Sequence, residues 1–208
     1  MRLYHKIQTV FDRDPATKHR TLIEGQWAKP EFELLADLQW EWTEKIDGTN
    51  IRIIRDADGV TYGGRSDNAQ IPAHLTNHLV ETFGDNQALL DLGENVTLYG
   101  EGFGARIQKG GGNYIPDGCG FILFDVKIGD YLLRREDVYD VAKRLGIPAV
   151  PVVGFGTLHE AVDLVRGTMM SAFGPFVAEG LVMRPQVDLY DRSGHRVIAK
   201  IKTKDFPR

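Results

Sequence analysis

Polar and apolar residues alternate along several stretches of the chain, a pattern typical of strands that bury one face. LQWEWTEKI alternates up to Lys45, and residues 51–55 continue the alternation into an ADG turn that predicts a hairpin before VTYGGR. Further strands are predicted near residues 96–103 and 120–128, and over AEGLVMRP and RVIAKIK toward the end of the sequence. Strands therefore dominate the predicted secondary structure.

Three other stretches repeat their apolar residues every three to four positions, as an amphipathic helix does. The first begins at Pro72 and ends at Gly84, the second spans about residues 135–145, and the third begins at a Thr157–Glu160 capping box and ends near Gly167. The residues expected to face the core are Leu75, Leu79, Val80, Phe83, Val138, Val141, Ala142, Leu145, Ala161, Leu164 and Val165. Many strands with a few inserted helices predict an α+β fold with largely antiparallel sheets.

Composition favours an ordinary globular protein. The 208 residues, 42% of them hydrophobic and 26% charged, fit one soluble domain over residues 1–208, and no repeat or long linker divides the sequence. A single cysteine, Cys119, excludes an internal disulfide and suits a reducing compartment. The opening residues lack the apolar run of a signal peptide, and no stretch is long and apolar enough to span a membrane. We therefore expect a cytoplasmic protein without a membrane partner.

The net charge of −4 argues against a surface that binds a polyanion over its whole extent. A nucleic-acid ligand would need a local basic groove instead. Arg52 and Arg65 are among the residues that could line one, although a solvated surface position is the simpler interpretation of any single arginine.

Several nucleotide and metal motifs are incomplete in this sequence. Gly100, Gly102 and Ala105 form GxGxxA after a predicted strand, but the helix that a dinucleotide site needs does not follow. His74 and His78 have zinc-ligand spacing on a helix but lack a third ligand, so exposed helical histidines are the better interpretation. No GxxxxGK[ST] loop occurs. A nucleoside triphosphate would therefore bind through another architecture.

Residues 44–50 read EKIDGTN, which suits an enzyme whose lysine attacks the α-phosphate of a nucleotide. A lysine amine is protonated at neutral pH, so this attack needs neighbouring cations or a metal that favour the neutral amine. Lys200 and Lys202, together on a late AKIK strand, are candidates for those neighbours. The carboxylates Glu101 and Glu179 each lie beside a glycine on an apolar strand.

Six short blocks follow one another in a fixed order over residues 44–202. They are KIDG with Lys45 and Asp47, GGRS with Arg65, YGEG with Glu101, GFILFD with Phe121 and Asp125, EGLVM with Glu179, and AKIK with Lys200 and Lys202. This order resembles the covalent nucleotidyltransferase superfamily of ATP-dependent polynucleotide ligases and mRNA capping enzymes. Thr49 and Asn50, together with GEGF followed by Gln108, resemble the phage RNA ligases that seal breaks in duplex RNA.

The resemblance implies a nucleotidyltransferase domain of largely antiparallel sheets with flanking helices. The sequence departs from the resemblance in ending six residues after Lys202, so a C-terminal OB domain is not expected. It implies an ATP-dependent RNA ligase, active in RNA repair, whose lysyl-AMP intermediate adenylylates a 5′-phosphate RNA end and joins that end to a 3′-hydroxyl. ATP and Mg²⁺ or Mn²⁺ are the implied cofactors. RNA with these ends is the implied partner, and the sequence leaves open whether a separate nucleic-acid-binding protein assists.

Roles follow from the same resemblance. Lys45 is the nucleophile, Asp47 belongs to its catalytic motif, and Lys200 and Lys202 contact the α-phosphate. Glu101 accepts hydrogen bonds from the ribose, and Glu44 contributes to adenine recognition. Phe121 stacks on adenine, with a plain core residue as the alternative. The remaining implied contacts are Glu179 to the metal, Asn50 to the 3′-hydroxyl, Arg65 to the 5′-phosphate and Gln108 to the phosphates.

Other functions stay open at this point. A capping-type guanylyltransferase or a minimal DNA ligase would share the lysine chemistry. A non-catalytic nucleotide-binding or RNA-binding module is a further alternative, although such a module has no need of a nucleophilic lysine.

Overall fold

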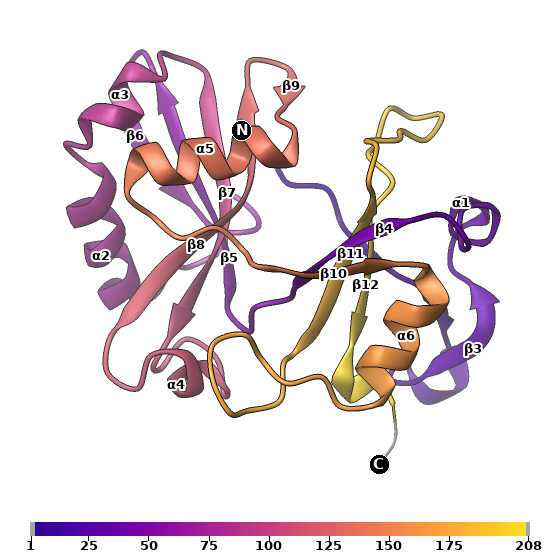
Figure 1. Ribbon diagram of the computed structural model, residues 1–208. Helices are drawn as coiled ribbons and strands as arrows, with labels where there is room; N and C mark the ends of the chain where they lie inside the picture. The colour runs from indigo at the N-terminus through magenta and orange to yellow at the C-terminus, as the bar shows by residue number, and fades with distance from the viewer. Residues whose placement is uncertain (1–2, 207–208) are drawn as a thin grey trace. The chain divides into compact units, whose positions relative to one another are not determined.

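The chain forms two compact units, which Figure 1 shows in a computed structural model that describes residues 3–206. Among the described residues, unit 1 contains Asp47–Val150 together with residues 3–4, and unit 2 contains His5–Ile46 and the residues from Pro151 onward. The boundary falls inside the lysine motif, so that Lys45 belongs to unit 2 and Asp47 to unit 1. The single domain expected from the sequence stays a prediction.

Unit 1 is built on a five-stranded sheet in the order β6-β5-β7-β8-β9. Its strands are β5 (Thr49–Asp56), β6 (Gly59–Gly63), β7 (Val96–Gly104), β8 (Cys119–Ile128) and β9 (Tyr131–Leu132), and each neighbouring pair is antiparallel. The predicted hairpin joins β5 to β6. In the β5–β7 register Asn50 lies opposite Glu101, which places their side chains on one face.

Helices cover the other face of this sheet (Figure 1). They are α2 (Ala73–Phe83), α3 (Gln87–Asp91) and α5 (Arg135–Leu145), and their apolar sides pack on Ile51, Ile53 and Leu98. The prediction that Val80 faces the core is wrong, because 49% of this α2 residue is exposed. Alternation along the strands therefore separates an apolar face under the helices from the face that carries Asn50 and Glu101.

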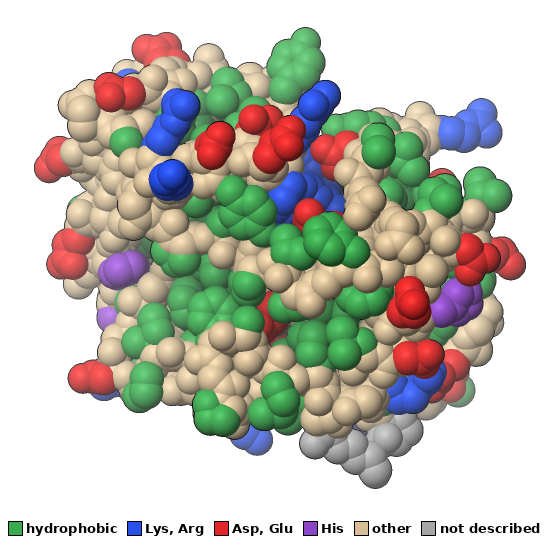
Figure 2. All heavy atoms as spheres, in the orientation of Figure 1, with side chains coloured by type: hydrophobic (Ala, Val, Ile, Leu, Met, Phe, Trp, Pro, Cys, Tyr) green, Lys and Arg blue, Asp and Glu red, His purple; other side chains and the backbone are tan. Residues whose placement is uncertain are grey.

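Helix α5 shows how local sequence sets an element. Its first turn carries Glu136 and Asp137, and its last turn carries Lys143 and Arg144, so both ends complement the helix dipole. Figure 2 shows acidic (red) and basic (blue) side chains together on the surface over α5. Gly146 ends the helix in the left-handed conformation, with φ of 70°.

Unit 2 contains a second five-stranded sheet in the order β1-β12-β11-β4-β10. Its strands are β1 (Gln8–Thr9), β4 (Trp40–Glu44), β10 (Val152–Gly156), β11 (Gly180–Pro185) and β12 (Ala199–Lys202). The β1–β12 pair is parallel and the other pairs are antiparallel. Strands β2 (Phe11–Arg13) and β3 (Leu22–Trp27) form a small separate ribbon. The short helices of this unit are η1 (Pro15–Thr17), α1 (Pro30–Leu34) and η2 (Thr203–Asp205).

Helix α6 (Leu158–Arg166) packs on one face of this sheet and begins at the predicted capping box. Its buried residues contact a core that includes Trp40, Leu181 and Ile201. The prediction for Leu164 is wrong, since 39% of it is exposed. Because Ala199 and Ile201 face this core, Lys200 and Lys202 project from the opposite face of β12.

The predicted α+β fold with largely antiparallel sheets is confirmed. None of the helices within residues 3–206 has the length and apolar character needed to cross a membrane.

Candidate active site

A carboxylate bridges two lysine amines in unit 2. Glu179 Oε2 lies 2.6 Å from Lys45 Nζ, and Glu179 Oε1 lies 2.6 Å from Lys202 Nζ. The three side chains are 14–19% exposed. A largely buried carboxylate that accepts from two ammonium groups is well stabilised, and the formal charge of the three side chains together is +1. We call these three residues the lysine cluster.

Backbone pairing at the ends of three strands assembles the lysine cluster. Lys45 follows directly after β4, and its amide donates to Gly180 O at 2.9 Å. The amide of Thr203 donates to Glu179 O at 2.9 Å, and Gly180 pairs with Lys202 in the β11–β12 register. The cluster therefore depends on the correct register of β4, β11 and β12.

Gly180 is required where β11 meets β12. Its φ of +150° is one that side-chain-bearing residues rarely adopt, and a Cβ there would collide with Ile201 O. The glycine after Glu179 thus allows the close strand approach that brings this carboxylate to Lys202.

A second ion pair fixes the end of β12. Asp205 Oδ2 accepts from the Lys202 amide at 3.1 Å, and Asp205 Oδ1 lies 2.7 Å from Arg13 Nη2. Lys200 lies two residues earlier, beside Val182 in the β11–β12 register. Lys200 therefore shares a face of the sheet with Lys202.

Glu44 points to the other side of β4 from Lys45 and is 1% exposed. Its carboxylate accepts from Ser171 Oγ at 2.6 Å and from the Ala172 amide at 2.7 Å. Burial raises the pKa of Glu44, while these two hydrogen bonds act in the opposite direction. Its observed role is to hold residues 171–172 beside β4, and adenine recognition by Glu44 stays a prediction.

Asn50 and Glu101 lie opposite each other on one face of the unit 1 sheet. Asn50 Oδ1 is buried and has no hydrogen-bond partner within residues 3–206. A Cβ at Gly48 would collide with Gly102 O and lie 2.8 Å from Glu101 Cγ, so the glycine of the lysine motif lets the chain pass close to β7. This face therefore presents an amide and a carboxylate next to the start of β5.

Asp47 lies beside the glycine run at residues 110–112. Its amide donates to Tyr114 Oη at 3.3 Å, and a Cβ at Gly110 would lie 2.9 Å from Asp47 Oδ2. These glycines begin the short helix α4 (Gly111–Tyr114), in which a Cβ at Gly111 would collide with Gly104 O. The run thus permits close packing on β7. Gln108 is exposed on the loop that leads into α4.

The interpretation of Arg52 as a groove-lining cation is wrong. Arg52 is fully buried, donates from Nε to Gly64 O at 2.7 Å, and pairs through Nη2 with Asp67 at 2.9 Å. Its guanidinium occupies the space beside Gly63, where a Cβ would lie 2.9 Å from Nη2. Arg52 therefore anchors the loop that carries the exposed Arg65.

Phe121 occupies the core of unit 1. It is 3% exposed, and its ring meets Phe83 edge-on with centroids 5.4 Å apart. This burial agrees with the alternative of a plain core residue, and adenine stacking by Phe121 stays a prediction.

An aromatic cluster around Asp125 did not emerge from the sequence. Tyr4 Oη donates to Asp125 Oδ2 at 2.9 Å, and the Tyr4 ring lies 5.0 Å from Tyr99 and 5.1 Å from Phe124. The GFILFD block signalled Asp125, but no local pattern indicates that Tyr4 packs on it from 121 residues away. Ser171, the partner of Glu44, was missed for the same reason.

The comparison with protein families decides what these blocks belong to. The family model described as RNA ligase matches residues 38–202. The chain belongs to the RNA ligase family. The matched region includes the lysine cluster in unit 2 and Asn50 and Glu101 in unit 1. A comparison with curated proteins finds no match.

Solved structures of RNA ligases share the fold of this RNA ligase family member. An RNA ligase from Naegleria gruberi with pyrophosphate has 22% sequence identity and a TM-score of 0.66, over 83% of this chain and 52% of the other. A variant of the Naegleria gruberi RNA ligase with ATP and Mn has 20% sequence identity and a TM-score of 0.66, again over 83% of this chain and 52% of the other. An archaeal ATP-dependent RNA ligase has 17% sequence identity and a TM-score of 0.68, over 99% of this chain and 49% of the other. The present chain thus spans about half the length of these ligases.

Proposed function

We propose that this chain carries the catalytic core of an ATP-dependent RNA ligase that works through lysyl-AMP, in the manner of the phage ligases that seal duplex RNA. The observation that carries this proposal is the lysine cluster, in which Lys45 and Lys202 share the Glu179 carboxylate at 2.6 Å each. A carboxylate between two amines suits a site where one amine must lose a proton and the other must stay charged.

The first step forms a bond from Lys45 Nζ to the α-phosphorus of ATP and breaks the bond from that phosphorus to the bridging oxygen, so that pyrophosphate leaves. Lys45 must lose a proton before it attacks, and Glu179 Oε2 at 2.6 Å is within reach to accept it. Lys202 and Lys200 then offset the negative charge that develops on the α-phosphate.

Glu179 also fits the role of a metal ligand supplied from the protein. No group of three or more metal-binding side chains occurs among residues 3–206, so a divalent ion would take its other ligands from phosphate oxygens and water. Mg²⁺ and Mn²⁺ accept such a ligand set. When bound, the ion would neutralise phosphate charge.

Unit 1 would supply the contacts of the later steps. The buried Asn50 Oδ1 lacks a hydrogen-bond partner within residues 3–206, which suits it to accept a hydrogen bond from the 3′-hydroxyl of an RNA end. The exposed Arg65 suits a 5′-phosphate, Gln108 suits a neighbouring phosphate, and Glu101 suits the ribose hydroxyls of AMP. The adenylate would pass to the 5′-phosphate, after which the 3′-hydroxyl would displace AMP and form the phosphodiester.

Labelling with ATP tests the lysyl-AMP chemistry. The wild-type protein should retain label from the α-phosphate after denaturation, and Lys45→Ala and Lys45→Arg should retain none. Lys143→Ala is the matched control, because it removes a lysine from the surface of α5. Label that persists in Lys45→Ala would show that another residue is the nucleophile.

A second assay tests the nucleic acid. Breaks with a 3′-hydroxyl and a 5′-phosphate are offered in all-RNA, all-DNA and hybrid duplexes. We expect sealing to require a ribonucleotide on the 3′-hydroxyl side, and equally fast closure of all-DNA breaks would contradict the RNA assignment.

A further inference from the structure

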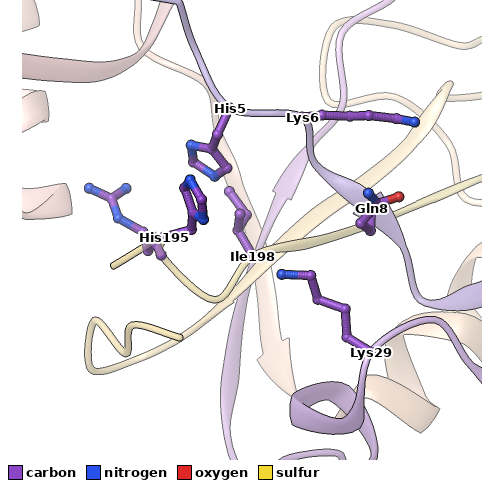
Figure 3. A pocket seen from close by; sticks show the side chains of 7 residues that line it. His5, Lys6, Gln8, Lys29, His195 and Ile198 are labelled. Atoms are coloured by element: carbon purple, nitrogen blue, oxygen red, sulfur yellow. The ribbon is translucent and has the colours of Figure 1, made fainter. Parts of the chain in front are cut away.

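Unit 2 contains a cavity of about 250 Å³ that the proposed chemistry does not use. It lies between the segment before β1, the residue that precedes α1, and the chain that leads into β12, and Figure 3 shows it from close by. Its polar lining consists of His5, Lys6, Gln8, Lys29, His195 and Arg196. Ile198 provides an apolar wall.

Among the described residues 3–206, the lining contains cations and hydrogen-bond donors but no carboxylate. Figure 3 shows the Lys29 amine directed toward Ile198 and the rings of His5 and His195 next to each other, with centroids 6.3 Å apart. Lysine, arginine, histidine and glutamine side chains can together donate several hydrogen bonds to one ligand. Such a lining selects an anion with several acceptor oxygens.

Two aspartates outside the lining offset part of this charge. Asp191 Oδ2 lies 3.2 Å from Lys29 Nζ, and Asp188 Oδ1 lies 3.5 Å from Arg196 Nε. Lys6, Lys29 and Arg196 carry three positive charges, and Asp188 is shared with Arg184 Nη1 at 3.9 Å, so these two aspartates do not cancel the charge of the lining. An anion would therefore be attracted although the whole protein is acidic.

Strand β12 connects this cavity to the lysine cluster. Ile198 and Arg196 precede the strand at one end, and Lys202 closes it at the other. The three steps from Ala199 to Lys202 span roughly 10 Å, at about 3.3 Å per residue. Lys200 lies between the two ends on the same face as Lys202. A nucleic-acid strand held at both places would follow a row of positive charge.

We propose that this cavity binds a backbone phosphate of the RNA strand whose end is sealed at the lysine cluster. The proposal rests on the proposed function for its choice of ligand, because a free phosphate or pyrophosphate has the same oxygen chemistry. Phosphate contacts of this kind position a strand without reading its sequence.

The experiment compares two double variants of the full chain. Lys6→Gln with Lys29→Gln removes two charges from the cavity, and Lys18→Gln with Lys143→Gln removes two exposed charges elsewhere while matching the change in net charge. Binding of a nicked RNA duplex is measured by fluorescence anisotropy from about 50 to 200 mM salt. Self-adenylylation with labelled ATP is measured on the same samples.

We expect the cavity variant to bind the duplex about tenfold more weakly at low salt than the control. Its slope of log Kd against log salt should fall by about 0.7–0.9 for each backbone phosphate that the variant no longer neutralises. Self-adenylylation should stay within about twofold of wild type in both variants, because neither changes the lysine cluster. Equal slopes for the two double variants would overturn the proposal.

Inorganic phosphate distinguishes the two sources of the ligand. The imidazole NMR signals of His5 and His195 are followed as the RNA duplex or phosphate alone is added. Shifts with RNA, and none with phosphate at the same concentration, support a strand-binding site. Equal shifts with phosphate alone would overturn the strand proposal in favour of a free-anion site. A wild type that binds RNA with the expected slopes but never takes up label would overturn the proposed function, and only the binding of an RNA backbone phosphate in the cavity would then stand.

Discussion

The two units share a plan but stabilise their charged residues differently. Each has a five-stranded sheet with helices on one face and polar side chains on the other. In unit 2, Glu179 joins lysines from two other segments, one of them 134 residues away. In unit 1, the buried Arg52 finds its partners only 12 and 15 residues along the chain, at Gly64 and Asp67.

This difference separates reactive charge from structural charge. The lysine cluster is assembled by strand register, is part-exposed and holds two lysines for one carboxylate. Under the proposed function, a substrate phosphate would replace Glu179 as the partner of these lysines. Arg52 is fully buried, and its hydrogen bonds fix a loop. We therefore expect substitutions in unit 2 to impair the first chemical step and those in unit 1 to impair later positioning.

The largest expected effect is the contrast between two single variants, Glu179→Ala and Asn50→Ala. Glu179→Ala removes the group that can accept the Lys45 proton and bind a metal, so self-adenylylation should fall by about 100-fold or more. Asn50→Ala should adenylylate itself almost normally and seal RNA slowly. Single-turnover rates for both steps check this order, and the reverse order would undo both assignments.

The next largest effect concerns the close approach of β11 and β12 at Gly180. Gly180→Ala combines an unfavourable φ with a collision against Ile201 O, and we expect the free energy of unfolding to fall by more than the roughly 1–3 kcal/mol that such a φ alone costs. Gly194→Ala is the control, because Gly194 has φ of 76° and no atom within 4 Å of its Cβ position. Urea unfolding of the two variants isolates the collision, and equal losses would show that β12 moves aside.

Loss of the Arg52 loop anchor in unit 1 should lower the free energy of unfolding by a smaller amount. Arg52→Met removes hydrogen bonds from a charged donor, and we expect a loss of about 1.5–3 kcal/mol in the free energy of unfolding, together with slower sealing through Arg65. Asp67→Asn should cost less than about 1 kcal/mol, since the Asp67 side chain is half exposed. If Arg52→Met seals at the wild-type rate, the loop does not depend on this anchor.

The smallest effect concerns pH. The folded protein holds the Glu44 proton more tightly than the unfolded chain, because burial raises the pKa of Glu44 above its ordinary value of 4.5. The free energy of unfolding should therefore contain a contribution that falls as the pH rises from 4.5 through the raised value. Glu44→Gln should remove this contribution, and Ser171→Ala should enlarge it. Urea midpoints between about pH 4 and 7 measure the slope, and identical slopes for wild type and Glu44→Gln would contradict the assignment.

Much of the fold followed from local pattern. The predicted strands around residues 96–103 and 120–128, the helix at 135–145 and the capping box at Thr157 agree with the structure, because each depends on side-chain periodicity or on caps within a few residues. The first 40 residues were harder. Strands β1, β2 and β3 are two to six residues long, and short strands depend on their partners more than on their own sequence.

The sequence by itself determined the family blocks, their order and the alternation that puts Lys200 and Lys202 on one face. The tertiary structure alone decided that Glu179 bridges Lys45 and Lys202, that Phe121 belongs to the core, and that Lys6, Lys29 and Arg196 line one cavity. The physical reason is distance along the chain. Periodicity fixes which way a side chain points within its own element, whereas its partner is chosen by strand register and packing between segments that lie far apart in the sequence, as the 134 residues between Lys45 and Glu179 show.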